Sequence, residues 1–166
     1  MALAPTDFYS QTPDASSTRQ QMPSFDFGAK PWSVYKEMMC HVSLRPTRQR
    51  MLLAWILFSR GNRHVTAEML YDEAIKAKIP VSLATVYNNL HQFTDAGLVQ
   101  QIAFDGSKAF FDTNTTTHYH FFISGEHDPI DIPAEEVVLS NMPELPAGHE
   151  ITRIDVVLRL RRKARA

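Results

Sequence analysis

The sequence predicts an α+β fold, in which a group of helices and a short β-ribbon precede a smaller α/β unit. Two observations predict this order. Apolar residues recur at helical spacing behind good N-cap residues as far as Ala96, whereas apolar and polar residues alternate, as in strands, near the C-terminus. Helices followed by a two-stranded ribbon form a winged helix-turn-helix, so we expect a winged-helix domain at 29–113 and an α/β domain at 114–166.

Composition limits the classes of function. A hydrophobic content of 44% over 166 residues supports a packed core, and the net charge of −1 means that any nucleic-acid contact must come from a local basic cluster. The single cysteine, Cys40, excludes an internal disulfide and fits a reducing, cytoplasmic compartment. No apolar run approaches the roughly 18 residues of a membrane span, so we expect no membrane partner.

The N-terminal region is expected to contain a tail and one helix. Residues 1–28 are rich in Gln, Ser, Thr and Pro and lack an aliphatic pattern, which predicts a disordered tail. A first helix should follow, with Ser33 as its N-cap and with Val34, Met38 and Val42 on its buried face.

Three further helices are predicted behind the hydroxyl N-caps Thr47, Thr66 and Ser82. The last of them spans Leu83–Ala96 and is ended by Gly97. The residues expected to face the core are Met51, Leu52, Trp55, Ile56 and Phe58, then Met69, Leu70, Ala74 and Ile75, and finally Leu83, Val86, Leu90 and Phe93.

The opposite side of the last helix carries small, polar and aromatic residues but no charge, which suits base edges and phosphates in a major groove. Three arginines surround the first turn of the second helix, where they suit phosphate, although an ordinary solvated helix start fits this segment equally well. The predicted DNA-binding residues are Arg45, Thr47, Arg48, Arg50, Ser82, Thr85, Tyr87, Asn88 and, at the ribbon tip, Lys108.

The ribbon should consist of a strand at Leu98–Phe104, a turn at Asp105–Lys108 and a return strand at Ala109–Asp112. In the α/β unit, strands are expected at His118–Ile123, Ile130–Ile132 and Ile154–Leu160, with a helix at Ala134–Asn141. The last strand alternates, so one face should be buried, while Val157 on the other suggests contact with a second subunit or a helix.

Two histidines, His118 and His120, lie two residues apart in a predicted strand. Alternate strand residues face the same way, so the two imidazoles can bind neighbouring positions on a single ion. For an isolated pair of this kind, two half-buried strand residues without a ligand are the commoner outcome, so the rest of the sequence decides between these alternatives.

Several motifs resemble those of the ferric uptake regulator (Fur) family, over a match from about Leu44 to Leu160. They are Leu44-Arg-Pro-Thr-Arg-Gln-Arg50, His64-Val-Thr-Ala-Glu-Met-Leu-Tyr71, Val81-Ser-Leu-Ala-Thr-Val-Tyr-Asn88, Asp95-Ala-Gly-Leu98 and His118-Tyr-His120. Within the family, the chain looks most similar to the iron response regulator (Irr) branch. The motifs that suggest this are the first and third above, Phe111-Asp-Thr-Asn114 and Arg153-Ile-Asp-Val-Val-Leu-Arg159.

This resemblance implies a dimeric metal-responsive repressor with a DNA-binding winged helix and a C-terminal domain for dimerisation and ligand sensing. It also implies a regulatory site of His64, Asp112, His118, His120 and Asp131. Three imidazoles with one or two carboxylates suit Fe²⁺, Mn²⁺ or Zn²⁺. The chain departs from the family in having Asp112 where Glu is usual, and in lacking the Cys-x-x-Cys pairs that hold a structural zinc in many members.

The branch resemblance further implies haem sensing through His118 and His120. Haem iron takes axial ligands on opposite sides of the ring, so two histidines on one strand face suit a single metal ion better than haem. Haem and a metal ion both remain candidate effectors. The Cys-Pro that binds haem in some branch members is replaced by Lys30-Pro31, and His127 near Asp131 is an additional candidate ligand. The histidines expected to be ordinary surface residues are His41, His91 and His149.

We therefore expect an iron- or haem-responsive DNA-binding repressor of iron-homeostasis genes, acting as a homodimer on a palindromic operator. A manganese, zinc or peroxide sensor on the same scaffold is the alternative. A metal-dependent hydrolase is less favoured, because the sequence has no His-Glu-x-x-His pattern and the uncharged helix face would have no role. We expect no enzymatic activity.

Overall fold

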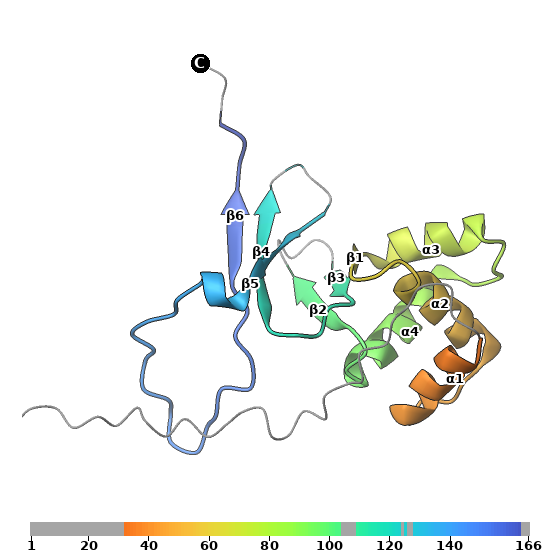
Figure 1. The fold of residues 1–166 in the computed structure, drawn as a ribbon, viewed down its shortest axis with the longest axis horizontal. Helices are drawn as coiled ribbons and strands as arrows, with labels where there is room; N and C mark the ends of the chain where they lie inside the picture. Colours follow the sequence, from red (N-terminus) through yellow and green to blue (C-terminus); the bar gives the residue numbers. More distant parts are fainter. Residues whose placement is uncertain (1–31, 104–108, 124, 126–127, 164–166) are drawn as a thin grey trace, which may run out of the picture.

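The computed structural model describes residues 32–103, 109–123, 125 and 128–163. Four helices gather at one end, a three-stranded sheet adjoins them, and a second three-stranded sheet forms the other end (Figure 1). The predicted α+β fold class, with a winged helix-turn-helix ahead of a smaller unit, is confirmed. The predicted tail at 1–28, Lys30-Pro31, the turn at Asp105–Lys108 and His127 lie outside the described residues.

Three of the four hydroxyl caps that the sequence predicts are present, and Ser33 is the exception. The side-chain oxygens of Thr47, Thr66 and Ser82 each accept a hydrogen bond from the main-chain N–H three residues later, which satisfies a donor that the first helical turn leaves free. The helices that they begin are α2 (Arg48–Phe58), α3 (Ala67–Lys76) and α4 (Leu83–Asp95).

The first helix, α1 (Trp32–His41), begins two residues earlier than an N-cap at Ser33 predicts, so Ser33 lies inside it. Its buried face consists of Tyr35, Met38 and Met39, whereas Val34 is only half-buried. The predicted face was therefore displaced by about one residue around the helix.

The core lies between the helices, and α2 is its centre because it contacts α1, α3 and α4. It buries Leu53, Ala54 and Leu57, which the sequence does not predict, whereas the predicted Trp55 is 40% exposed. The predicted Met51, Ile56 and Phe58 are buried and Leu52 packs against the core, so the prediction fails only at Trp55. A helix with neighbours on several sides has no single apolar stripe, which is why the pattern left out three buried residues. The predicted Ile75 is also exposed. The side chains that α3 and α4 bury are Ala67, Leu70 and Ala74, then Val86, Asn89, Leu90 and Phe93.

The first sheet is antiparallel, in the order β1-β3-β2. Its strands are β1 (His64–Val65), β2 (Gln100–Ala103) and β3 (Ala109–Asp112). The ribbon of β2 and β3 is predicted, but the two-residue β1 is not. Leu98, expected in the ribbon, instead follows the turn at Gly97 and is buried in the helical core. Pairing of β1 with β3 places His64 opposite Asp112.

The second sheet has the order β5-β4-β6, with β5 antiparallel and β6 parallel to β4. Its strands are β4 (His118–Ile123), β5 (Ile130–Pro133) and β6 (Val157–Leu160). The predicted helix at Ala134–Asn141 is wrong, because only Ala134–Glu136 forms a 3₁₀ turn, η2. So short a segment becomes helical only when one face packs against another element, and Val138 is 87% exposed.

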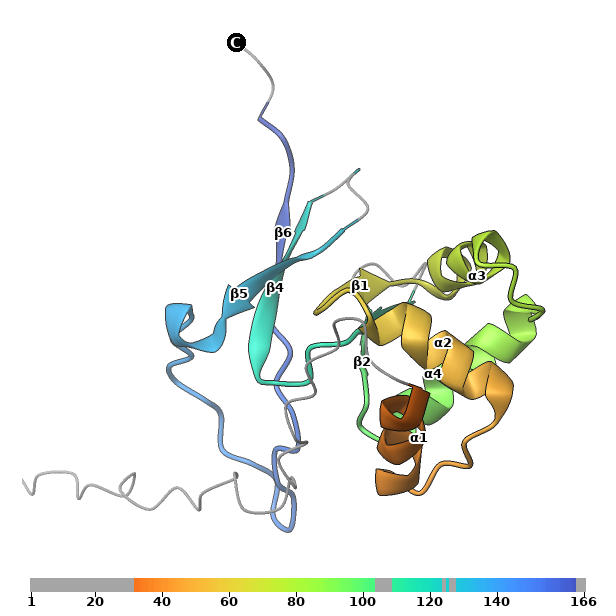
Figure 2. The same cartoon turned by 45° about the vertical axis from the view of Figure 1, so that its right-hand side comes forward.

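A small apolar cluster joins the two sheets. Ile102 of β2 and Phe110 of β3 are buried in it, and Phe122 of β4 and Val157 of β6 pack against them. Val157 thus contacts the first sheet, where the sequence suggests a helix or a second subunit. Figure 2 shows the second sheet set apart from the helices, with the first sheet between them. None of the described helices is long and apolar enough to cross a bilayer.

Candidate metal centre

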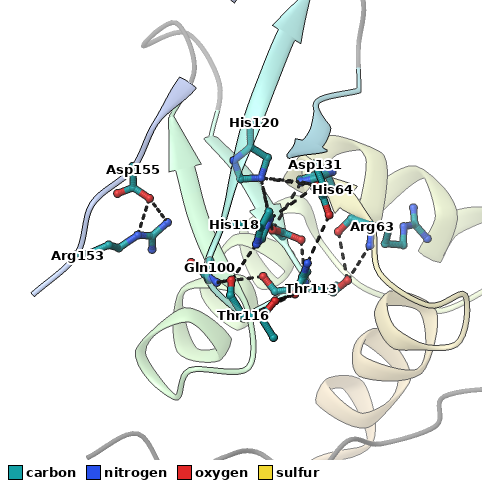
Figure 3. Close-up of polar contacts among 12 residues, drawn as sticks. Arg63, His64, Gln100, Thr113, Thr116, His118, His120, Asp131, Arg153 and Asp155 are labelled. Atoms are coloured by element: carbon teal, nitrogen blue, oxygen red, sulfur yellow. Dashed lines mark hydrogen bonds and ion pairs between the residues drawn. The ribbon is translucent and has the colours of Figure 1, made fainter. Parts of the chain in front are cut away.

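Five side chains from the two sheets converge on one point. They are His64 of β1, Asp112 at the end of β3, His118 and His120 of β4, and Asp131 of β5. Figure 3 labels the three histidines and Asp131. Each offers one ligand atom, and these atoms all lie within 4.8 Å of one another. The structure therefore brings together all five residues of the regulatory site that the family resemblance implies, while the additional candidate His127 lies outside the described residues.

Strand pairing explains how residues distant in sequence meet. The pleat of β4 puts His118 and His120 on one face, while the register of β4 with β5 places Asp131 opposite His120. In the first sheet, His64 and Asp112 are direct partners across β1 and β3. Each sheet thus contributes its own group of ligands, and the centre lies where the sheets meet.

The distances between these atoms fit a single ion. The Nε2 atom of His120 lies 3.0 Å from that of His118 and 3.1 Å from that of His64. The carboxylates are equally near, with 2.8 Å from His118 Nε2 to Asp112 Oδ2 and 3.1 Å from His64 Nε2 to Asp131 Oδ1. Two ligand atoms at right angles and about 2.1 Å from an ion are about 3.0 Å apart, so the separations match those of atoms sharing one cation.

Hydrogen bonding at His118 shows which of its two ring nitrogens can bind a metal ion. Its Nδ1 atom lies 2.8 Å from the carbonyl oxygen of Thr116, to which it can only donate. In the neutral form, which binds metals, the ring then directs its Nε2 lone pair at Asp112 Oδ2, so two acceptors face each other. A second-layer bond of this kind is usual for metal-binding histidines, and a cation between the two atoms removes the repulsion.

Burial adds to the need for positive charge. Asp112 is fully buried, its Oδ1 atom accepts the N–H of Asn114, and among the described residues its Oδ2 atom accepts no hydrogen bond. Such a carboxylate oxygen is costly to bury unless an ion or donor compensates it. Of the remaining side chains, those of the three histidines are 6–9% exposed, whereas that of Asp131 is 39% exposed. The donor set and its burial thus fit a divalent cation.

The protonation state of His64 also suits metal binding. Burial lowers the pKa of His64 below its ordinary value, although Asp112 and Asp131 partly oppose the shift. Neutral imidazole is the form that coordinates metals, so the lowered pKa keeps the ring available near neutral pH.

A second layer of contacts holds the ligands, and the sequence does not predict it. The N–H of Arg63 donates to Thr113 Oγ1 at 2.8 Å, and the N–H of Thr113 donates to the Arg63 carbonyl at 3.1 Å. These bonds lock the residues beside His64 and Asp112 together (Figure 3). The guanidinium of Arg63 also pairs with Glu73 of α3. In the sequence, Thr113 is noted only as part of the Phe-Asp-Thr-Asn motif, which indicates the family but predicts no structural role for it.

Most of the residues predicted to bind DNA lie at the surface of α2 and α4. Thr85 is half-buried, and Lys108 lies outside the described residues. The fully exposed members of the set are Arg45, Thr47, Arg48, Ser82 and Asn88.

Arg50 and Tyr87 have internal contacts that the sequence does not predict. Nε of Arg50 donates to Asn89 Oδ1 at 3.2 Å, and the guanidinium also donates to Gln92, so this side chain connects α2 to α4. The hydroxyl of Tyr87 donates to Glu68 of α3 at 2.7 Å, and this bond raises the Tyr87 pKa.

Comparison with known proteins agrees with this geometry. A sequence profile described as the ferric uptake regulator family matches residues 41–156. The ferric uptake regulation protein of Shigella flexneri is 32% identical over 108 residues, which are 65% of this chain and 73% of that protein. The peroxide-responsive repressor PerR of Staphylococcus epidermidis is 41% identical over 78 residues, 46% of this chain and 51% of that protein.

Among solved structures, the ferric uptake regulator from Pseudomonas aeruginosa with manganese superposes with a TM-score of 0.62 at 31% identity. The superposition covers 79% of this chain and 99% of that one. The ferric uptake regulator of Vibrio cholerae, at 24% identity and a TM-score of 0.61 over 76% of this chain and 98% of that one, has the same fold.

Proposed function

The chain belongs to the ferric uptake regulator family, and on this premise we propose that it is a metal-responsive repressor of iron-homeostasis genes. In this proposal it is cytoplasmic, binds double-stranded operator DNA through a winged-helix domain at 29–113, and forms a homodimer through residues 114–166. The observation that supports it most strongly is the convergence of five ligand side chains from both sheets.

The proposed effector is Fe²⁺, Mn²⁺ or Zn²⁺, which this set of nitrogen and oxygen donors suits. His64 and Asp112 would hold it from the first sheet, and His118, His120 and Asp131 from the second. A bound divalent cation supplies the positive charge that the buried carboxylate needs. Because the ligands come from both sheets, they restrict the angle between the winged helix and the second sheet. Operator affinity then changes only by the difference in effector affinity between the two arrangements.

For DNA, we propose that α4 is the recognition helix. Its exposed face has Asn88 and other uncharged polar residues that suit base edges, while Arg45 and Arg48 suit phosphates at the start of α2. In a homodimer the two recognition helices would contact half-sites separated by about one helical turn of DNA or a multiple of it.

Iron as the natural metal, and haem as a second effector, are finer proposals that rest on the similarity to the iron response regulator branch. Haem would use His118 or His120. Their Nε2 atoms converge at 3.0 Å and their side chains are 6% exposed, which supports an ion in the closed site and haem only after the sheets separate. Haem titration should give a Soret shift in the wild type that His118→Ala/His120→Ala removes; an unchanged shift would place haem elsewhere.

The main proposal is tested by operator binding with and without Mn²⁺. We expect metal to change the operator affinity of the wild type by about 5-fold or more, as is typical of allosteric coupling. The His118→Ala/His120→Ala variant should keep its fold and dimer but lose this response. Tyr87→Ala is the complementary variant: it should weaken operator binding while its metal uptake stays unchanged. A double variant that responds normally would place the sensing site elsewhere.

A peroxide sensor is the second candidate, and the 41% identity to the peroxide-responsive repressor PerR favours it specifically. The test is to load the protein with Fe²⁺, expose it to hydrogen peroxide and map the products by mass spectrometry. Addition of oxygen to His64, His118 or His120, together with loss of operator binding, would support this function. Unmodified histidines would support a metal sensor instead, and metal analysis would separate iron from manganese and zinc.

A further inference from the structure

Asn114 lies in the segment between β3 and β4, where the chain passes from one sheet to the other, and it contacts both acidic ligands. Its main-chain N–H donates to Asp112 Oδ1 at 2.8 Å. Its side-chain Nδ2 donates to Asp131 Oδ2 at 3.4 Å. One residue thus forms bonds to a carboxylate from each sheet.

The orientation of the Asn114 amide is determined by its other contacts. Its Oδ1 atom accepts the N–H of Thr116 at 3.2 Å and the Thr116 hydroxyl at 2.6 Å. If the amide oxygen and nitrogen were exchanged, the oxygen would face the Asp131 carboxylate, and two acceptors would repel each other. The N–H₂ would then face the Thr116 N–H, and two donors would meet. Only the orientation that donates to Asp131 satisfies both sides.

These bonds determine which oxygen of each carboxylate faces the metal centre. Asp112 Oδ1 and Asp131 Oδ2 are occupied by Asn114, and the remaining oxygens are the ones that face the imidazoles. Asp112 Oδ2 lies 2.8 Å from His118 Nε2, and Asp131 Oδ1 lies 3.1 Å from His64 Nε2. Each bond from Asn114 uses one lone pair of its oxygen and directs that oxygen away from the imidazoles, so the bonds favour presentation of the other oxygen to the centre.

We propose that Asn114 is a positioning residue that makes each of the two carboxylates present one oxygen to the metal centre and holds them in place before a metal binds. The inference rests on the proposed function only in taking the five-residue cluster as a metal site. Second-layer residues of this kind orient ligands and affect metal affinity. Asp131 depends on Asn114 more than Asp112 does, because it is more exposed and is bound through a side chain.

The same bond carries a consequence for metal selectivity. Zn²⁺ is commonly satisfied by four ligands, so it tolerates the loss of an oriented Asp131. Mn²⁺ prefers oxygen ligands and higher coordination numbers, so it needs both acids. Asn114 should therefore favour Mn²⁺ or Fe²⁺ relative to Zn²⁺.

The experiment compares wild type, Asn114→Ala and Gln100→Ala by calorimetric titration with Mn²⁺ and Zn²⁺. Asn114→Ala keeps the N–H that binds Asp112 and removes only the side-chain bonds. Gln100→Ala is the matched control, because Gln100 Nε2 binds the carbonyls of Asn114 and Thr116 at 3.0 and 3.3 Å and thus holds the same segment without donating to a carboxylate.

We expect Asn114→Ala to weaken Mn²⁺ binding by at least about 10-fold, the usual effect of losing a second-layer partner, and Zn²⁺ binding by less. Gln100→Ala should bind both metals nearly as the wild type does. Absorption of the Co²⁺ protein is a second measurement, since its visible bands should intensify in Asn114→Ala as an oxygen ligand is lost. Urea unfolding of the metal-free variants checks that both are folded.

Equal losses in the two variants, or wild-type Mn²⁺ affinity with an unchanged Co²⁺ spectrum in Asn114→Ala, would overturn this inference. These results differ from failure of the proposed function. If the wild type binds neither Mn²⁺ nor Co²⁺, the metal site itself is wrong, whereas normal binding by Asn114→Ala contradicts only the role of Asn114.

Discussion

Asp112 is completely buried, and its Oδ2 atom faces the Nε2 lone pair of His118 at 2.8 Å in the tautomer that Thr116 selects. An arrangement of this kind favours a bound cation but destabilises the metal-free fold. At the scale of single residues, the same atom, Asp112 Oδ2, thus destabilises the metal-free fold and stabilises the metal-bound one.

Replacing Asp112 by Asn should therefore have opposite effects on binding and stability. Oδ1 would still accept the Asn114 N–H, and the new amide would donate to an imidazole, so we expect metal-free stability to rise by about 1–2 kcal/mol. Metal affinity should fall by about 10-fold or more, since an anionic ligand is lost. Urea unfolding with and without Mn²⁺ measures both changes. A variant that is less stable without metal would show that the carboxylate is mainly structural.

Acidification should destabilise the metal-free protein through His64. Burial lowers its pKa in the fold, so the unfolded chain binds a proton more readily, and stability falls as pH falls. This contribution is fully present above about pH 6.5, the ordinary value, and is lost as the pH drops through the lower folded pKa. Urea unfolding at about pH 7.5 and about pH 5.5 should show a smaller loss in His64→Gln than in the wild type. Identical losses would assign the effect to other groups.

At the scale of elements, one side chain connects the first turn of α2 to the second half of α4. Arg50 donates to Asn89 and Gln92 of α4 and to the carbonyl of Arg45, whereas Arg48, two residues earlier, is exposed. Both arginines are predicted DNA contacts, but of the two only Arg50 binds α4, the proposed recognition helix, and helps to fix its position.

This difference predicts distinct phenotypes for two alanine variants. Arg50→Ala should lose about 1–2 kcal/mol of stability, because it leaves the part-buried Asn89 oxygen of α4 without this donor and also removes the exposed bond to Gln92. It should also weaken operator binding. Arg48→Ala should weaken operator binding with a stability change within about 0.5 kcal/mol, as for most surface substitutions. Thermal unfolding and operator titration of both proteins test this. Equal stability of the two variants would show that the Arg50 contacts do not hold α4.

Elements whose formation depends on local bonds are predicted well from the sequence. Thr47, Thr66 and Ser82 cap their helices because the bond spans only three residues. Which face is buried depends on distant neighbours, and this is why Trp55 was assigned to the core although it is exposed. The two-residue β1 is too short to leave a pattern, and it forms because β3 lies beside it.

The same division applies to the candidate site. Strand alternation placed His118 and His120 on one face, and the family motifs added the other three ligands. The second layer was not predictable, because the bonds from Arg63 to Thr113 span 50 residues and depend on the pairing of β1 with β3. Asn114 likewise acts across two sheets that the sequence does not position relative to each other.

At the scale of the whole molecule, the C-terminal part exposes many large apolar side chains. Scattered exposed apolar residues are ordinary, but a group of them beside an edge strand suits contact with another chain. β6 is such an edge, in the order β5-β4-β6. This supports the proposed homodimer. Leu158 and Leu160 lie on β6 itself, and Val138, Leu139, Met142, Leu145, Ile151 and Ile154 lie in the segment between η2 and β6.

A charge on this surface should dissociate the dimer. Leu158→Glu is expected to shift the protein from dimer to monomer in analytical ultracentrifugation, because burying the carboxylate in an apolar interface is costly. Ile75→Glu, at an exposed position of α3 in the helical part, is the control and should remain dimeric. If Leu158→Glu sediments as the wild type does, the interface lies on another surface.

The apolar cluster of Ile102, Phe110, Phe122 and Val157 lies beside the metal centre and shares with it the task of joining the two sheets. In the proposed mechanism the effector acts against the energy of rearranging this joint, so the strength of the cluster should affect the effector concentration at which operator affinity changes. None of its members supplies a metal ligand. Evolution can therefore adjust the switching threshold through apolar substitutions such as Ile102→Val, while the choice of ion stays with the imidazoles and carboxylates.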